Sequence, residues 1–167
     1  MKKLLIVSIL TATVFCSNGQ DKLMDILPLK DGVVTYTNVI SIDGVNKDEL
    51  YSRAKKWFVT TYKSANDVIQ LDDKENGEIV GKGNFNITYY ARDPFINHAI
   101  TISVKDGRFK YLITDLTYSD KQGDKFPIEA FPKGWAGKKK LYETIDREIN
   151  LLIASIEKAM KSKADEW

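Results

Sequence analysis

One histidine and one aspartate are the residues whose types and spacing could perform acid–base chemistry. His98 is the single histidine of the 167-residue chain, which excludes His-rich metal sites and catalysis by a pair of histidines. Asp106-Gly107 lies between two alternating runs and favours a two-residue type I′ turn. The strand register that follows from this turn places Asp115 directly opposite His98.

An Asp–His pair can orient a general base, and a serine or threonine could complete a nucleophilic triad. The spacing identifies no such third residue. We favour the alternative, in which His98 and Asp115 form a cross-strand polar pair at the end of an apolar face. On this interpretation the chain has no catalytic residue, and His98 and Asp115 remain weak candidates.

Three aromatic residues are candidates for a binding surface. Phe126, Phe131 and Trp135 lie in a loop spanning residues 120–138, and both phenylalanines precede a proline. We expect these rings to close the edge of a sheet as part of the core. The alternative is that they are exposed, in which case they would bind a partner protein or an apolar ligand.

The remaining motifs predict neither a metal nor a cofactor. Asp72, Asp73, Glu75 and Glu78 cluster near a turn and could in principle hold calcium through oxygen atoms, but their spacing does not match an EF-hand loop. The glycines of residues 81–83 form too short a segment to cradle a phosphate. We expect a solvated hairpin tip at the acidic residues.

The first segment has the pattern of a secretory signal. Met1–Lys3 is basic, residues 4–15 are mostly apolar, and small residues follow at Ser17 and Gly19. The apolar run is too short to span a bilayer as a helix of the mature protein. We therefore expect cleavage after Gly19, export to the periplasm or the medium, and a mature chain without a transmembrane helix.

Cys16 raises the alternative of a lipoprotein. A lipoprotein signal is cleaved just before a cysteine that follows small residues, whereas the bulky Phe15 precedes Cys16. Lipidation at Cys16 is therefore the less favoured interpretation.

Removal of the signal changes the charge balance. The full chain has 25 basic and 23 acidic residues, and loss of Lys2 and Lys3 leaves the mature chain neutral. Nucleic-acid binding derives much of its affinity from neutralising phosphates, so we expect no nucleic-acid partner. Because Cys16 is the single cysteine, the mature chain has no disulfide, no thiolate nucleophile and no cysteine-ligated metal.

The turn at 106–107 also predicts the pairing of two strands. Apolar residues face one another on one side, and Lys105 faces Arg108 on a mostly polar side. The expected pairs on the apolar side are Val104 with Phe109, Ile102 with Tyr111, and Ile100 with Ile113. One face of the sheet is therefore expected to be covered and the other largely open.

Hydrophobic periodicity predicts the other elements. Strands are expected at 33–42, 68–71 and 78–87, a helix from the Asn46 cap to about Ser64, and a long amphipathic helix at 141–163. The fold class is α+β: an antiparallel sheet of about five strands in the order β-α-β-β-β-β-α, with both helices packed on one face. The expected boundaries are a signal peptide at 1–19, an N-terminal extension at 20–30, one domain at 31–163 and a tail at 164–167.

This order of elements, together with Leu27-Pro28, the Gly-Glu-Ile-Val-Gly-Lys-Gly strand at 77–83 and the terminal helix, resembles the family called domain of unknown function 4468. The resemblance covers about residues 30–160. It implies a TATA-binding-protein-like fold and an exported bacterial protein. Since it implies no activity, no functional residue can be carried over, and the fold name implies nothing about DNA.

These observations predict an exported, non-enzymatic binding or interaction module of the cell envelope. Its partner would be a protein or a small apolar ligand. The alternatives are a small hydrolase that uses His98 and Asp115, and a carrier that holds an apolar ligand between the helices and the sheet.

Overall fold

The computed structural model describes residues 25–62, 64–89, 92–132 and 134–162. The expected signal segment, its cleavage after Gly19, Cys16 and the tail at 164–167 therefore lie outside the described residues. The elements are β1 (Leu29–Lys30), β2 (Val33–Val34), β3 (Tyr36–Ser41), α1 (Lys47–Thr61), α2 (Ala65–Val68), β4 (Ile69–Asp73), β5 (Glu78–Asn86), β6 (Phe95–Lys105), β7 (Arg108–Ser119), β8 (Lys125–Pro127), the 3-10 turn η2 (Ile128–Ala130) and α3 (Lys138–Lys161).

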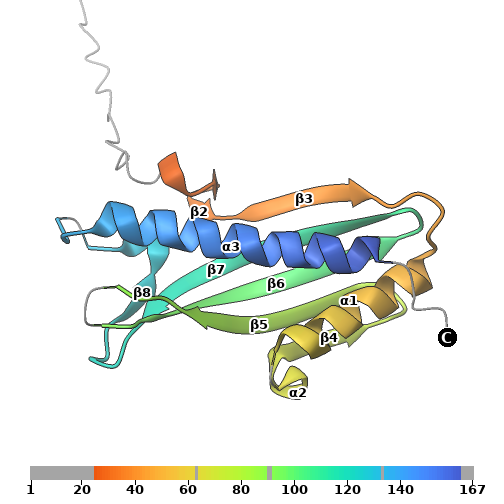
Figure 1. The fold of residues 1–167 in the computed structure, drawn as a ribbon, viewed down its shortest axis with the longest axis horizontal. Helices are drawn as coiled ribbons and strands as arrows, with labels where there is room; N and C mark the ends of the chain where they lie inside the picture. Colours follow the sequence, from red (N-terminus) through yellow and green to blue (C-terminus); the bar gives the residue numbers. More distant parts are fainter. Residues whose placement is uncertain (1–24, 63, 90–91, 133, 163–167) are drawn as a thin grey trace, which may run out of the picture.

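The predicted α+β fold is confirmed. The main sheet is antiparallel with the strand order β3-β7-β6-β5-β4, and the short strand β8 also pairs with β7. It has more strands than the expected five because residues 125–127 pair with the end of β7 instead of forming a loop. The helices α1 and α3 both lie on one side of this sheet (Figure 1). We call the opposite side the open face.

The predicted hairpin register is confirmed next to the turn. Lys105 pairs with Arg108, and the apolar pairs Val104–Phe109, Ile102–Tyr111 and Ile100–Ile113 follow. The six apolar side chains of these pairs are buried on the helix-covered side. On the open face, Lys105, Arg108 and Lys110 are exposed, as the alternation predicts.

The register changes farther from the turn. Ala99 pairs with Thr114, but Asn97 pairs with Thr117, so β7 contains one residue more than β6 over this interval. Asp115 adopts a positive φ of 58° within the resulting β-bulge. A bulge of this kind bends the strand and reverses the side-chain alternation beyond it. Leu116 and Tyr118 are consequently buried, where an unbroken alternation would have exposed them.

Helix α1 packs closely against β5 because two glycines leave room for its aromatic side chains. The helix begins after Asn46, whose side chain accepts a hydrogen bond from the Glu49 amide at 2.9 Å. A Cβ atom on Gly81 would collide with the Phe58 ring, and one on Gly83 would collide with the Tyr62 ring. The glycines thus allow a close approach of helix and sheet.

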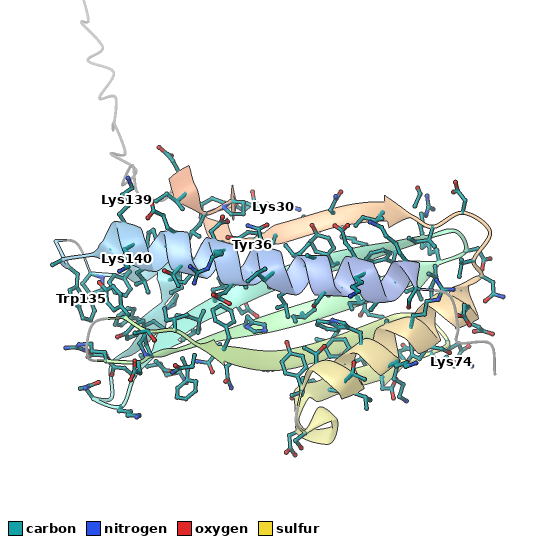
Figure 2. All side chains as sticks on the ribbon, in the orientation of Figure 1. Lys30, Tyr36, Lys74, Trp135, Lys139 and Lys140 are labelled. Carbon is teal, nitrogen blue, oxygen red and sulfur yellow. The ribbon has the colours of Figure 1, made fainter. Side chains whose placement is uncertain are left out.

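Helix α3 covers the rest of the same side of the sheet. It is amphipathic, and its buried side chains recur at helical spacing: Leu141, Tyr142, Ile145, Ile149, Ile153, Ile156 and Met160. Polar contacts with other elements help to fix its position: among them, the Tyr36 hydroxyl donates to Asp146 at 2.8 Å, and Trp57 Nε1 donates to Ser155 at 3.0 Å. Side chains fill the layer between the helices and the sheet, with Tyr36 of β3 beside α3 (Figure 2).

Candidate functional site

His98 lies in the core, on the side of the sheet that the helices cover. Only 3% of its surface is exposed. Its direct partner on β5 is Gly83, and the space above that glycine is occupied by Tyr62 at the end of α1. The Tyr62 hydroxyl lies 3.1 Å from His98 Nε2, and the Phe85 ring lies 5.5 Å from the imidazole ring.

These surroundings keep the imidazole neutral. Burial lowers the pKa of His98 to about 4, because the charged form loses its hydration. Burial also raises the pKa of Tyr62 well above its ordinary value, so that both members of the pair are uncharged at neutral pH. A buried imidazole of low basicity is poorly suited to take a proton from a substrate.

The predicted pairing of His98 with Asp115 is wrong. The β-bulge shifts the register between Asn97 and Ala99, so Asp115 is not the cross-strand partner of His98. Asp115 is exposed in a groove that His98 also borders, but the buried His98 ring contacts Tyr62 and Phe85 and forms no hydrogen bond with Asp115. The inserted residue explains the error, because counting from the turn assumes an unbroken ladder.

A groove of about 400 Å³ lies on the open face at this bulge. In addition to Asp115, it is lined by Lys82, Gly83 and Asn84 of β5, Asn97, His98 and Ala99 of β6, Thr117 of β7 and Lys125 of β8. Asn97 is held in place by donating hydrogen bonds to the Thr117 carbonyl at 3.3 Å and to the Ser119 hydroxyl at 2.9 Å. The groove therefore offers ammonium, amide and carboxylate groups on a rigid strand platform.

A second hollow of about 260 Å³ lies on the open face beside the turn of the β6–β7 hairpin. Its lining includes the cationic residues Lys105, Arg108 and Lys110, together with Ser103 and Val39. Val39 belongs to the edge strand β3 and is 56% exposed. The sequence analysis placed the three cations on the polar side of the hairpin, but it did not identify either hollow as a site.

The aromatic residues Phe126, Phe131 and Trp135 pack against one another and against Tyr118. The ring centroids of Phe131 and Trp135 are 4.7 Å apart, and those of Tyr118 and Phe126 are 5.0 Å apart. Phe131 is buried, and the other two are partly buried against the core. This packing agrees with the expectation that the rings close the edge of the sheet.

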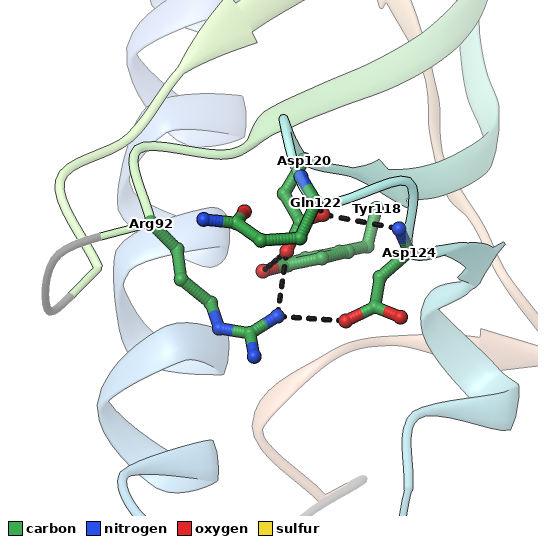
Figure 3. A network of polar contacts seen from close by, with 5 residues as sticks. All are labelled: Arg92, Tyr118, Asp120, Gln122 and Asp124. Carbon is green, nitrogen blue, oxygen red and sulfur yellow. Dashed lines mark hydrogen bonds and ion pairs between the residues drawn. The ribbon is translucent and has the colours of Figure 1, made fainter.

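A polar network of five residues anchors the same end of the molecule (Figure 3). Arg92 Nη1 lies 2.8 Å from Asp120 and 2.7 Å from Asp124, and its guanidinium lies 4.9 Å from the centre of the Trp135 ring. The Asp120 side chain is fully buried and also accepts hydrogen bonds from the Tyr118 hydroxyl and the amides of Gln122 and Asp124. Sequence analysis missed this network, because nothing in the spacing connects Arg92 to residues 118–124.

Protonation in this network follows from its contacts. Burial raises the pKa of Tyr118 to about 12, and the hydrogen bond to Asp120 acts in the same direction. Burial alone would raise the pKa of Asp120, but hydrogen bonds from Arg92 and Tyr118 outweigh it and the pKa is lowered. Asp120 is thus an ionised, fully bonded structural group.

The described residues contain no cluster of histidine, cysteine, aspartate and glutamate side chains that could hold a metal ion. Within the same part of the chain, no helix is long and apolar enough to cross a membrane.

Comparison with known proteins gives the family of the chain. Residues 36–119, which run from β3 to the end of β7, match the family described as "Domain of unknown function (DUF4468) with TBP-like fold". The chain belongs to the DUF4468 family. The matched segment contains the main sheet apart from β8, together with both hollows of the open face apart from Lys125.

Two crystal structures are similar to this DUF4468 protein. A TBP-like protein from Parabacteroides distasonis ATCC 8503 is 17% identical, with a TM-score of 0.74 over 83% of this chain and 99% of that one. A DUF4468 family protein from Bacteroides ovatus ATCC 8483 is 18% identical, with a TM-score of 0.66 over 85% of this chain and 94% of that one. At these identities the likeness establishes the fold alone. No curated protein matches the chain.

Proposed function

We propose that this DUF4468 protein is an exported, non-enzymatic binding module of the bacterial cell envelope, and that the open face of its sheet contacts the ligand. The observation that carries the proposal is the groove of about 400 Å³ at the β-bulge. Among the lining residues, Lys82, Asn84 and Lys125 are exposed, so their polar groups can reach a ligand.

The chemistry of the groove favours a polar ligand. Lys82, Lys125 and Asp115 have no ion-pair or hydrogen-bond partner for their side chains within the described residues. Polar groups that line a concavity without internal partners are available to fix the orientation of a bound molecule. A carrier of an apolar ligand between the helices and the sheet is the less favoured function, since that layer is filled by buried side chains such as Phe58 and Ile145.

The position of His98 argues against the hydrolase alternative. General-base catalysis requires the base to come within hydrogen-bond distance of the substrate proton. His98 is almost completely buried, has a lowered pKa and does not pair with Asp115. This geometry supports the proposed non-enzymatic role over a hydrolase that uses His98 and Asp115.

The proposal of export depends on the sequence of residues 1–19. The basic start, the apolar run and the small residues at Ser17 and Gly19 support processing by a signal peptidase. Intact-mass measurement of the protein isolated from its own cells tests this part separately: a chain beginning at Gln20 supports it, and one beginning at Met1 contradicts it.

Nuclear magnetic resonance of the ¹⁵N-labelled protein, titrated with a fractionated extract of the native envelope, tests the binding surface. We expect amide shifts at Lys82, Asn84, Asn97 and Thr117, and little change along α3. The Asn84→Trp variant places a large side chain in the groove and should abolish the shifts. The control variant Asn150→Trp, at an exposed position of α3, should preserve them. Shifts confined to the helices would contradict the proposal, as would hydrolysis of an ester panel that His98→Ala abolishes.

A further inference from the structure

The hollow beside the β6–β7 turn brings three cationic side chains to one place. Lys105 and Arg108 are directly opposite each other, and Lys110 follows Arg108 on the same face of β7. Lys110 in turn lies between Ser103 of β6 and Val39 of β3. All three cations are exposed around a volume of about 260 Å³.

The grouping of these three cations does not stabilise the fold. Like charges directly opposite on an antiparallel pair repel each other and destabilise the sheet. Within the described chain, the side chains of Lys105, Arg108 and Lys110 take part in no ion pair or hydrogen bond. The hairpin therefore carries a repulsive pair and a third neighbouring cation, and none of the three forms an ion pair within the described residues.

The two carboxylates nearby in the sequence and the sheet make other contacts. Asp106, in the turn itself, accepts a hydrogen bond from the Lys47 amide at 2.7 Å at the start of α1. Glu78, opposite Ser103 on β5, accepts a hydrogen bond from the Ser103 hydroxyl at 3.2 Å. Neither carboxylate forms an ion pair with Lys105, Arg108 or Lys110, so the three side chains remain available to an external anion.

We infer that this hollow is a binding site for a phosphate group, carried by a soluble phosphate ester or by a lipid headgroup. A phosphate monoester brings about 1.5 to 2 negative charges at neutral pH, which matches three cations better than the single charge of a carboxylate. The guanidinium of Arg108 can contact two phosphate oxygens at once. The inference rests on the proposed function, because it assigns a ligand to part of the same open face.

The test is titration of the ¹⁵N-labelled protein with glycerol phosphate and, separately, its binding to phosphatidylcholine vesicles with and without phosphatidic acid, whose headgroup is also a phosphate monoester. We expect the amides of residues 105–110 to shift and Arg108→Ala to weaken binding at least tenfold. Saturable binding of glycerol phosphate assigns the site to a soluble ester, and binding only to the anionic vesicles assigns it to a headgroup. Either result supports a phosphate site, and the absence of both overturns it.

Lys30→Ala is the matched control, since it removes the same charge from an exposed position that lines neither hollow. It should leave glycerol phosphate or vesicle binding within about twofold of the original value. Equal losses in Lys30→Ala and Arg108→Ala would show diffuse attraction and overturn the inference. Acetate binding as tightly as glycerol phosphate would overturn it as well.

The Lys105→Glu variant tests whether phosphate binding can be lost without any loss of stability. This substitution turns the repulsive pair with Arg108 into an attractive one, so we expect a higher melting temperature together with at least tenfold weaker phosphate binding. A stable Lys105→Glu variant that still binds at full strength would overturn the inference.

The failure of this inference can be distinguished from the failure of the proposed function. If glycerol phosphate and anionic vesicles do not bind, but the envelope extract shifts other amides of the open face, only the assignment of a phosphate ligand is wrong. If no amide of the open face responds to any of these ligands, the proposed function is wrong as well.

Discussion

The Tyr62 hydroxyl lies 3.1 Å from Nε2 of His98, and this contact joins the end of α1 to the centre of β6. It depends on Gly83, whose missing side chain leaves the space that the Tyr62 ring occupies. The single histidine of the chain is therefore part of the packing between helix and sheet.

Loss of this contact should destabilise the fold. Tyr62→Phe removes the hydrogen-bond partner of a buried polar ring, and we expect the free energy of unfolding to fall by about 1–3 kcal/mol. Tyr51→Phe, on the same helix, removes a hydrogen bond to the exposed Asp72 and should cost less. Urea unfolding monitored by tryptophan fluorescence measures both. Equal losses in the two variants would contradict a buried His98–Tyr62 contact.

Stability should depend on pH through His98. Its pKa is about 6.5 in the unfolded chain and about 4 in the folded one, so between these values the unfolded state binds more protons. The contribution is fully present above pH 6.5 and is lost as the pH falls towards 4, by a total of about 3 kcal/mol.

Comparison with His98→Gln isolates this effect, because glutamine does not titrate. The free energy of unfolding of the original protein should fall more steeply than that of the variant between pH 6.5 and 4. Since carboxylates titrate in both proteins, only the difference between the two curves reports His98. Parallel curves would mean that the imidazole is accessible to solvent.

Gly81→Ala should destabilise the protein by about 1–3 kcal/mol, because the added methyl group collides with a fully buried ring. That ring belongs to Phe58, which has 0% exposure and would lie 2.4 Å from a Cβ atom at position 81. Lys82→Ala, the next residue on the same strand, points to the open face and should change stability by less than about 0.5 kcal/mol. Thermal unfolding of the two variants gives the comparison. A neutral Gly81→Ala would mean that α1 is farther from β5 than described.

The two carboxylates beside Arg92 should differ in importance. Asp120 is fully buried and accepts four hydrogen bonds, whereas the Asp124 side chain is 47% exposed and contacts Arg92 alone. We expect Asp120→Asn to lower the melting temperature clearly more than Asp124→Asn, because only the former disturbs a buried charge network. The reverse order in calorimetry would contradict the network drawn in Figure 3.

Local signals predicted much of the fold. The Asp106-Gly107 turn determined the pairing from Lys105–Arg108 to Ile100–Ile113, since a two-residue turn leaves one possible register. The Asn46 cap and the spacing of buried residues likewise predicted where α1 begins and which of its faces is covered. These features depend on residues close together in the sequence.

Features that depend on distant residues could not be predicted. The bulge inserts Asp115 without a glycine to indicate it, and the expected His98–Asp115 pair was wrong for that reason. The contact of Arg92 with Asp120 joins residues on separate segments, and no sequence pattern signals such an ion pair. The alternation of polar and apolar residues predicted that the cations of the hairpin lie on the open face. It could not predict the two hollows, because a hollow depends on how side chains from several strands pack together.

The bulge also changes which residues of β7, odd-numbered or even-numbered, face the core. Up to Ile113, odd-numbered residues are buried, whereas from Leu116 onward the even-numbered ones are. The half before the bulge pairs with β3, and the half after the bulge pairs with β8. A chain that lacked Asp115 alone would have an unbroken ladder, in which Leu116 follows Thr114 directly and Leu116 and Tyr118 still face the core. The bulge therefore adds one exposed carboxylate to the open-face groove without changing which side chains of β7 face the core.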